Sequence, residues 1–417
     1  FWLKRPKGQA AHLRHRMASE DDSAAFAARF EQLVVNRDGH GLHVLLRPVG
    51  ERCKRPRDEE RQPTQRPTDT TAGMLLLARN AVAREARLEA LLGALRSWCT
   101  RYLEWRDGPD DWMVLPLLRL EAGPRLLANQ LDRKAGSGRI RKKLVEAFRE
   151  HFQRLHRDGR KRAGALVMCC GLLRLYFGLG QANQCSFLLA AVSKQAQRGG
   201  EQRLGLEQLP KALAVSLCFL WGKHCVLDGK VAEAEERLGW ALANCPATST
   251  VHRQQILAYL VPCRLRFGRP VARATMHRHG LENCYAGLAA SVTRGDVRGF
   301  SHELQSHEAE LISVGTYLVV EKLKLLALRN LCRAVHSQQC AQAEQAGHAN
   351  NQHKQDLTPY ERAFRWQDDC DADETICILA HLIYIGAIRG YLSDEHRKVV
   401  FSKDLPFPDP ATWCPKA

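Results

Sequence analysis

Two histidines in the second half of the chain are the first residues that could do chemistry, because two histidines on one helix face can hold a zinc ion. The run His302-Glu303-Leu304-Gln305-Ser306-His307 nearly matches the zinc protease motif, in which the two histidines stand four residues apart. Here they stand five apart and Ser306 takes the required place, so His307 should turn away from His302. The spacing predicts surface histidines and no metal site.

Three other patterns also fail as catalytic motifs. His277-Arg278-His279 resembles the paired histidines of metal-dependent isopeptidases, but Gly287 and Ala290 replace the serine and aspartate expected downstream. Cys169-Cys170 lacks the CxxC spacing and lies in an apolar stretch, where cysteine acts as a small hydrophobe. Gly178-Leu179-Gly180 has no third glycine and no preceding strand. We therefore expect no enzyme, no catalytic residue, no metal and no cofactor.

A basic segment between residues 119 and 162 is the strongest sign of a binding surface. It holds fourteen Lys and Arg against five Asp and Glu, about half of the excess positive charge of the chain. Clustered cations attract phosphate backbones by direct pairing and counterion release. Gly136-Ser137-Gly138 predicts a loop that presents the candidate nucleic-acid-binding residues Arg133, Lys134, Arg139, Arg141, Lys142 and Lys143. A solvated helix face or a dock for an acidic protein would explain the same charge.

Composition predicts a folded protein of more than one unit. The chain has 417 residues, a formal net charge of +17, 45% hydrophobic and 26% charged residues. The positive charge favours acidic partners, either nucleic acid or an anionic protein. The fifteen cysteines are an odd number in a long chain, which indicates reduced thiols. Charged residues interrupt the most apolar stretches, so we expect a soluble protein that does not span a membrane.

The N-terminal part, residues 1–73, is predicted to be a basic and largely disordered arm. Residues 47–71 are crowded with Arg, Pro, Asp, Glu and Thr and show no apolar periodicity. Within them, Lys54-Arg55-Pro56-Arg57 resembles a nuclear-localisation cluster, although a solvated run of charges would look the same. Met17 resembles a natural start, in which case residues 1–16 are an artefact of gene prediction.

Residues 74–316 are predicted to form a solenoid of helical hairpins. Apolar residues recur there at helical spacing, and long alternating strand patterns are absent. A template of the tetratricopeptide type, anchored with its turn at Gly229, places small or apolar residues where two helices cross and a proline at the stop: Gly222, Ala234, Leu238, Ala241 and Pro246. A weaker match has its turn at Gly180, with Cys185 in the place of a small alanine. Such stacks are scaffolds more often than catalysts.

Residues 317–408 change character and predict a winged-helix domain, followed by a tail at 409–417. Val320 begins an apolar helical stripe, Thr358-Pro359 begins a second helix, and a third follows from about Asp373. Two β-rich runs around a polar turn then form a hairpin. The polar stretch 337–356 is expected to be a long connection, either in contact with a partner or exposed to solvent.

Several blocks in order along the chain resemble the PCI family of proteasome lid, signalosome and translation-initiation subunits. They are the runs at 253–262, 320–324, 378–386, 389–392 and 399–408, and the similarity extends from about Asp111 to Pro408. Within the family the chain is most similar to the branch of PCI domain-containing protein 2, also described as signalosome subunit twelve-like. This resemblance implies a mainly α fold, a helical-repeat solenoid followed by a winged helix, and a protein without catalytic activity.

The resemblance further implies a subunit of the nuclear transcription-and-export complex two, which couples transcription to mRNA export. Expected partners are a large scaffold PCI-type export subunit, a small acidic Sem-type proteasome-associated subunit, and RNA or DNA on a composite surface. The expected location is the nucleus, including nuclear pores, with some protein in the cytoplasm. The wing would contribute Arg389, Arg397, Lys398 and Lys403 to that surface. The alternative is an architectural subunit of a signalosome-like or splicing-linked PCI complex that does not itself bind nucleic acid.

Overall fold

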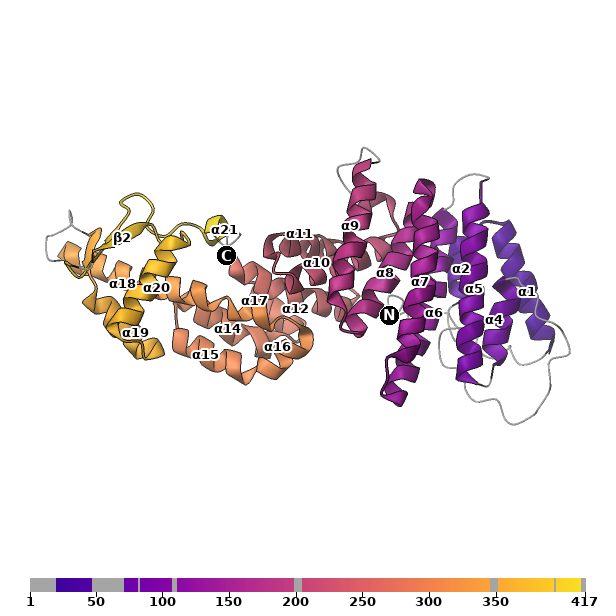
Figure 1. Ribbon diagram of the computed structural model, residues 1–417, viewed down its shortest axis with the longest axis horizontal. Coiled ribbons are helices and arrows are strands. Elements are labelled where there is room, and N and C mark those ends of the chain that lie inside the picture. The colour runs from indigo at the N-terminus through magenta and orange to yellow at the C-terminus, as the bar shows by residue number, and fades with distance from the viewer. Residues whose placement is uncertain are drawn as a thin grey trace. The chain divides into compact units, whose positions relative to one another are not determined.

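The computed structural model describes residues 20–46, 71–81, 83–106, 111–198, 205–345, 352–393 and 395–413. The chain divides into two compact units, with the boundary between Leu220 and Trp221; Figure 1 labels the helices and strands of both. The proposed start at Met17 and the cluster Lys54-Arg55-Pro56-Arg57 lie outside the described residues.

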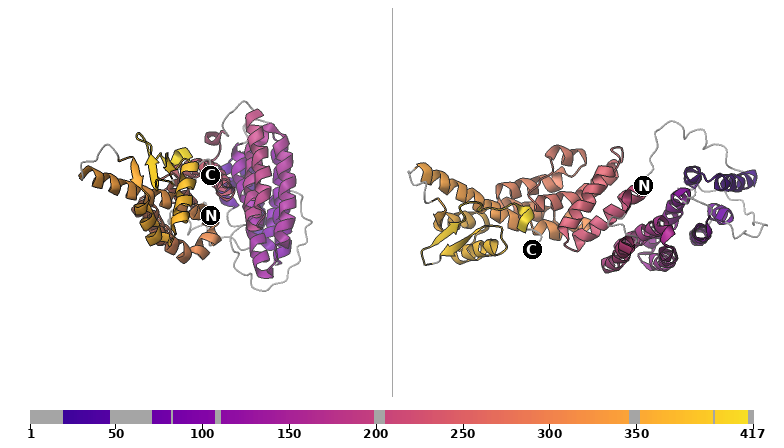
Figure 2. Two further views of the ribbon diagram at one scale, coloured as in Figure 1. Left: turned by 60° about the vertical axis from the view of Figure 1, so that its left-hand side comes forward. Right: turned by 90° about the horizontal axis from the view of Figure 1, so that it is seen from above.

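Unit 1 is helical throughout its described residues. Successive helices pack side by side, α4 on α5, α5 on α6, α6 on α7 and α7 on α8 (Figures 1 and 2). The helices are α1 (Glu20–Val35), α2 (Gly39–Leu45), α4 (Thr71–Asn80), α5 (Arg84–Glu104), α6 (Asp111–Ala135), α7 (Arg139–Arg157), η1 (Gly159–Lys161), α8 (Arg162–Gly178), α9 (Ala182–Arg198) and η2 (Leu206–Gln208), with α10 (Lys211–Leu227) crossing into unit 2.

The prediction of a largely disordered arm is wrong for residues 20–46, which form α1 and α2. Phe26 and Phe30 stand four residues apart on α1, and both are buried. Phe30 packs edge-on against Trp98 of α5, with ring centroids 6.0 Å apart. Trp98 is fully buried and donates a hydrogen bond to the Met113 carbonyl. Two aromatic side chains in one helical turn thus bury enough apolar surface to hold a short helix that composition alone does not predict.

The helical hairpin predicted at Gly229 is confirmed. Gly229 follows α10 with a φ of +75°, a left-handed conformation that glycine adopts without strain. A Cβ on Gly222 would lie 2.6 Å from Leu238 of α11 (Val231–Asn244), so glycine is required where the two helices cross. Ala234 and Ala241 are fully buried on α11. The second match is also a hairpin: α8 ends before Gly180, and Cys185 is a buried residue of α9.

The helices of unit 2 continue the repeat and then lead into a small sheet. They are α11, α12 (Thr250–Arg266), α13 (Arg273–Arg278), α14 (Glu282–Arg294), α15 (Val297–Ser306), α16 (Glu308–Val314), α17 (Tyr317–Glu321) and α18 (Lys324–Gln345). One apolar core extends without a break from α12 into the C-terminal sheet, and it includes Leu257, Phe300, Leu326 and Phe401. The domain boundary placed between residues 316 and 317 stays a prediction.

The winged helix is confirmed, with the order α18, β1 (Lys354–Asp356), α19 (Thr358–Asp368), α20 (Ala372–Tyr384), β2 (Gly390–Ser393) and β3 (Lys398–Phe401). The strands form an antiparallel sheet in the order β1-β3-β2, drawn as yellow arrows in Figure 2. A capping box begins α20, since Asp371 and Glu374 each accept a backbone N–H of the other. The expectation of a polar connection at 337–356 is wrong at both ends, because α18 extends to Gln345 and β1 pairs with β3.

The tail predicted at 409–417 is part of the core up to Trp413. Pro410–Trp413 form the short helix α21, and the Trp413 side chain is buried. The buried Arg329 of α18 donates hydrogen bonds to the carbonyls of Phe407 and Pro408 and so ties the returning chain down. Burial of the large tryptophan ring stabilises this C-terminal segment, although the polar residues around it in sequence suggest an exposed tail.

The apolar stretches noted in the sequence are core helices. In α8, Cys169 and Cys170 are buried, and burial raises the pKa of the Cys170 thiol to about 12. Both therefore stay protonated and act as small hydrophobes, as their setting predicts. Within the described ranges, no helix has the combination of length and apolarity that crossing a membrane requires.

Candidate nucleic-acid interface

Five exposed cations surround the turn between α6 and α7, and we call this set the basic turn. Arg133 and Lys134 end α6, three residues form the turn, and Arg139, Lys142 and Lys143 lie on the first turns of α7. Gly136, with a φ of +61°, permits the tight reversal. A three-residue connection holds the two helix ends together, so the five charges occupy one end of the helical hairpin.

Arg141, the sixth residue predicted for this surface, is engaged inside the fold. Its Nε lies 3.0 Å from Oδ2 of Asp132, a carboxylate with no exposed surface, and its Nη1 donates to the Gly178 carbonyl. Asp132 also accepts the backbone N–H groups of Ile140 and Arg141, which caps α7 from a distance in sequence. Burial alone would raise the pKa of Asp132, but these hydrogen bonds and the Arg141 charge hold it below its ordinary value. Arg141 thus positions the turn and offers no free charge.

The basic turn differs from the rest of the basic segment because its charges face solvent. Among the residues that the structure describes, no carboxylate lies within ion-pair distance of its five side chains. Elsewhere in the segment, Arg125 pairs with the buried Glu121, and the buried Lys161 donates to the Trp105 carbonyl. The net positive charge of the whole segment is therefore larger than the positive charge that is exposed to a ligand.

Helix electrostatics distinguish the two sides of the basic turn. Cations at the C-terminal end of α6 are favourable, because the helix dipole is negative there. Cations at the N-terminal end of α7 add to the positive end of a dipole and cost stability slightly. Lys142 and Lys143 therefore have no helix-stabilising reason to be where they are, and a bound anion would offset their repulsion.

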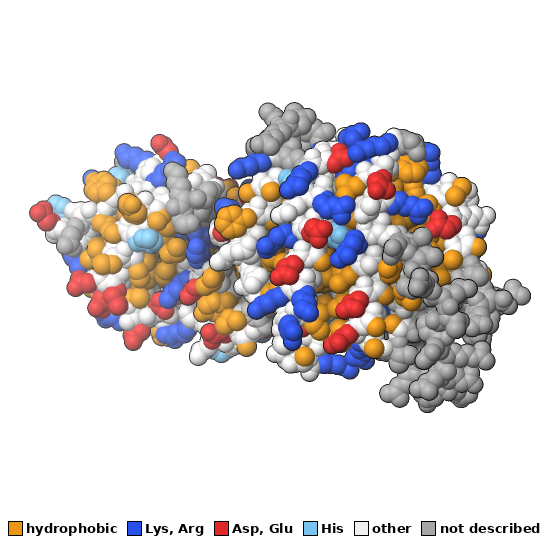
Figure 3. Space-filling model, turned by 45° about the vertical axis from the view of Figure 1, so that its right-hand side comes forward, with side chains coloured by type: hydrophobic (Ala, Val, Ile, Leu, Met, Phe, Trp, Pro, Cys, Tyr) orange, Lys and Arg blue, Asp and Glu red, His pale blue; other side chains and the backbone are white. Residues whose placement is uncertain are grey.

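The surrounding surface of unit 1 is mixed. On the face drawn in Figure 3, Lys and Arg side chains are spread among acidic and apolar ones over the helices of unit 1. Along the outer face of α7, Glu146 and Glu150 interrupt the exposed cations beyond Lys143. The unbroken positive patch is accordingly limited to the basic turn, which suits contact with a few phosphates and no extended groove.

The wing offers fewer free charges than its sequence suggests. Arg397 pairs with Glu361 of α19, and Lys398 lies 3.9 Å from Asp356 of β1. Arg389 and Lys403 are exposed, and neither has an ion-pair partner in the described part of the chain. They lie on neighbouring segments, because the N–H of Ser402 donates to the Arg389 carbonyl.

Two side chains on the outer face of the sheet were missed by sequence reasoning. Tyr391 and Lys354 both stand opposite Val400 in the register, so they share the face that points away from the buried Val399 and Phe401. Both are exposed. An exposed aromatic ring beside cations can stack on a base. The signal for Tyr391 was present in the alternation of β2, whereas Lys354 was assigned to a loop.

Helix α20, the third helix of the winged helix, carries no Lys or Arg. Its first turn holds Asp373 and Glu374, and its exposed side includes Cys377, Ala380 and Tyr384, the last 88% exposed. A helix that enters the major groove usually brings cations or amides to the base edges. This face instead suits contact with protein, so within the winged helix the cations that could meet nucleic acid lie on the wing.

The comparisons with known proteins agree with this architecture. No family model matches the chain. Enhanced ethylene response protein 5 of Arabidopsis thaliana is 30% identical over 311 residues, which cover 73% of this chain and 72% of that protein. PCI domain-containing protein 2 of Xenopus laevis is 27% identical over 319 residues, 73% of this chain and 75% of that one. Protein CSN12 homolog of Gibberella zeae is 29% identical over 57% of this chain and 53% of its own length.

These relatives match most of the chain, and the structure contains the helical repeats and the C-terminal winged helix that the PCI resemblance implies. The chain belongs to the PCI family, in the branch of PCI domain-containing protein 2 and the CSN12 homologues.

Proposed function

We propose that this protein is a non-catalytic subunit of a nuclear complex that couples transcription to mRNA export, and that it contributes to a composite nucleic-acid-binding surface. The observation that carries the proposal is the similarity to PCI domain-containing protein 2 over 73% of the chain. Membership of the family makes the chain a PCI scaffold subunit of a hetero-oligomeric complex. The export function, the nuclear location and the named partners go beyond family membership and are what we propose here.

A surface shared with a partner subunit is proposed because each basic region of this chain, taken by itself, has few free cations. The basic turn has five exposed cations, which is few for tight non-specific binding at physiological salt. The wing, considered separately, has Arg389 and Lys403, with Lys354 and Tyr391 on the adjoining sheet face. A large PCI-type export subunit that brought its own cations beside the wing would complete the surface. A small acidic Sem-type subunit would brace the helical repeats.

The alternative is an architectural subunit of a signalosome-like or splicing-linked PCI complex that does not contact nucleic acid. Two observations favour it. One relative is named Protein CSN12 homolog, and the exposed face of α20 lacks cations and presents neutral side chains such as Ala380 and Tyr384. In this case the basic turn would meet an acidic protein.

Affinity purification followed by mass spectrometry tests the choice between the two. The full chain carries a tag. It is compared with a variant in which Ala380 and Tyr384 are both replaced by Arg, which disrupts the exposed face of α20 and leaves its buried side intact. We expect a large PCI export subunit and a small acidic subunit with the unaltered chain and their loss from the variant. Signalosome subunits or a splicing-linked PCI partner, without an export scaffold, would overturn the proposal.

A further inference from the structure

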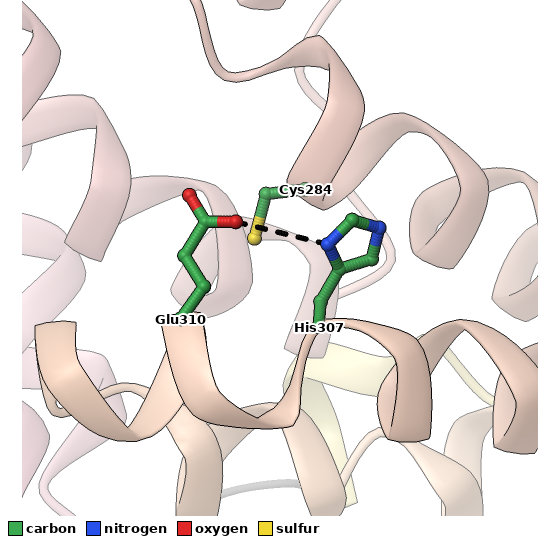
Figure 4. A group of neighbouring side chains, drawn as sticks. All are labelled: Cys284, His307 and Glu310. Atoms are coloured by element: carbon green, nitrogen blue, oxygen red, sulfur yellow. Dashed lines mark ion pairs between the residues drawn. The ribbon is translucent and has the colours of Figure 1, made fainter.

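Three side chains of different elements of unit 2 converge on one point (Figure 4). Cys284 lies in the first turn of α14, His307 lies at the junction of α15 and α16, and Glu310 lies one turn further along α16. The thiol sulfur, one imidazole nitrogen and one carboxylate oxygen all lie within 4.8 Å of one another. Sequence reasoning paired His307 with His302 and missed this group, since Cys284 is distant in sequence.

One pair of these atoms is separated by nearly the distance between zinc ligands, and the other pairs lie within 4.8 Å. Bond lengths of about 2.0 to 2.3 Å place the ligand atoms of a tetrahedral zinc site roughly 3.3 to 3.6 Å apart. His307 Nδ1 lies 3.7 Å from Glu310 Oε2. Small rotations of side chains, without movement of the helices, would therefore bring the three atoms onto one ion.

Within the described ranges, the two carboxylates near this group, Glu303 and Glu310, have no ion-pair partner other than His307. Cys284 is buried and its sulfur has no hydrogen-bond partner there, and no Lys or Arg pairs with Glu303 or Glu310. A divalent cation would balance a thiolate and a carboxylate together, and its arrival would release the thiol proton to solvent.

A second carboxylate lies near the other ring nitrogen of the histidine. Glu303 of α15 lies 3.8 Å from His307 Nε2, on the ring nitrogen that does not face Glu310. Room for this carboxylate comes from Gly287, because a Cβ there would lie 2.4 to 2.8 Å from the Glu303 carboxyl atoms. A carboxylate on the far nitrogen is the usual outer support of a histidine that binds metal.

We propose that Cys284, His307 and Glu310 bind one Zn²⁺ ion that joins α14 to the turn between α15 and α16. A sulfur, a nitrogen and a carboxylate oxygen form a donor set suited to zinc, with a fourth position for water. Water can enter on the side of Glu310, whose side chain is 58% exposed, whereas Cys284 closes the inner side. The role is structural, since the ion would hold two repeats together.

Zinc binding to the full chain, stripped with a chelator and carrying no histidine tag, tests this site. We expect one Zn²⁺ per chain by elemental analysis and calorimetry, a higher midpoint of thermal unfolding with zinc, and a thiolate-to-metal charge-transfer band when Co²⁺ replaces it. Cys284→Ala should abolish that band and weaken zinc binding at least tenfold. Glu310→Gln, on an exposed side chain that folding does not need, should also weaken binding about tenfold.

Two matched variants serve as controls. Cys340→Ala removes another cysteine that lies beside a histidine, His336 of α18, and Glu308→Gln changes a neighbouring exposed carboxylate of α16. Both should bind zinc as the unaltered chain does. The proposal is overturned if the unaltered chain fails to bind one zinc, if Cys284→Ala and Glu310→Gln bind as tightly as the controls, or if Cys340→Ala alone abolishes the charge-transfer band.

Discussion

The sequence predicted six binding cations around the turn between α6 and α7 of unit 1 and four on the wing of unit 2, and the two sets differ in what their charges face. Five of the six predicted residues at the turn are exposed without an ion pair in the described chain, and only Arg141 is engaged. On the wing, two of the four are paired, Arg397 with Glu361 and Lys398 with Asp356.

The difference arises from how each region is built. At the turn, one buried carboxylate, Asp132, holds both the helix end and Arg141, and the other cations stay outside. On the wing, antiparallel pairing places Asp356 opposite Lys398 in the register, so the sheet itself brings opposite charges together. The number of cations in a segment therefore does not by itself give the positive charge available to a ligand. That charge is known only when the positions of the nearby carboxylates are known.

The largest effect is expected from Asp132→Ala. This change removes two backbone hydrogen bonds and leaves the Arg141 guanidinium without its carboxylate, so the free energy of unfolding should fall by about 3 kcal/mol. Urea unfolding of the full chain measures it. The matched control is Asp371→Ala, which removes an exposed helix cap at the winged helix and should cost about 1 kcal/mol. Equal losses would show that the buried carboxylate holds the turn no more firmly than an ordinary cap.

The difference in free energy of unfolding between the unaltered chain and Asp132→Ala should also depend on pH. The pKa of Asp132 is below its ordinary 3.8 in the fold, so the carboxylate contributes its full stability above that pH and loses it as the pH falls through the lowered value. The gap in free energy of unfolding between the unaltered chain and Asp132→Ala should thus be constant near neutral pH and narrow below about pH 4. A gap that widened on acidification would contradict the assignment.

An intermediate effect is expected from reversing Lys142 and Lys143 to Glu. Binding of a labelled single-stranded RNA to the full chain with its PCI partner should weaken about tenfold, and the slope of affinity against salt should fall by about 1.4, since two phosphate contacts are lost. The fold should persist, because glutamates in the first turns of α7 suit the helix dipole.

The matched control for this reversal is Lys211→Glu with Lys322→Glu. Both lysines are exposed and lie outside the basic turn and the wing, and the change in net charge is the same. The control should bind RNA within about twofold of the unaltered complex, as expected for solvent-screened charges that belong to neither candidate region. The same loss in both double variants would assign the effect to total charge and remove the basic turn from the interface.

The smallest effect is expected on the wing. Arg389→Ala with Lys403→Ala should weaken RNA binding about threefold, because these two cations lack ion pairs in the described chain. Arg397→Ala with Lys398→Ala should leave affinity within about 1.5-fold, since both charges already face carboxylates. Fluorescence anisotropy on the same RNA measures both. A larger loss from the paired cations would reverse the comparison.

Local sequence rules predicted the elements of the fold well. The glycine and alanine spacing around Gly229 located a helical hairpin, because a close crossing and a left-handed turn each tolerate few residue types. Thr358-Pro359 at the start of α19 and the β-rich runs of β2 and β3 located the winged helix in the same way. Burial of α1 and of Trp413 was missed, because it depends on partner residues distant in sequence.

The sequence by itself determined that this chain forms helical hairpins followed by a winged helix, since helical periodicity, capping and turn residues act over a few neighbouring positions. Only the tertiary structure decided which charged and metal-binding side chains meet. Arg141 and Lys142 are adjacent and chemically alike, yet one is held by a buried carboxylate and the other faces solvent. Cys284 and His307 are brought together only by the packing of the helical repeats, because a side chain's partners depend on distance in space.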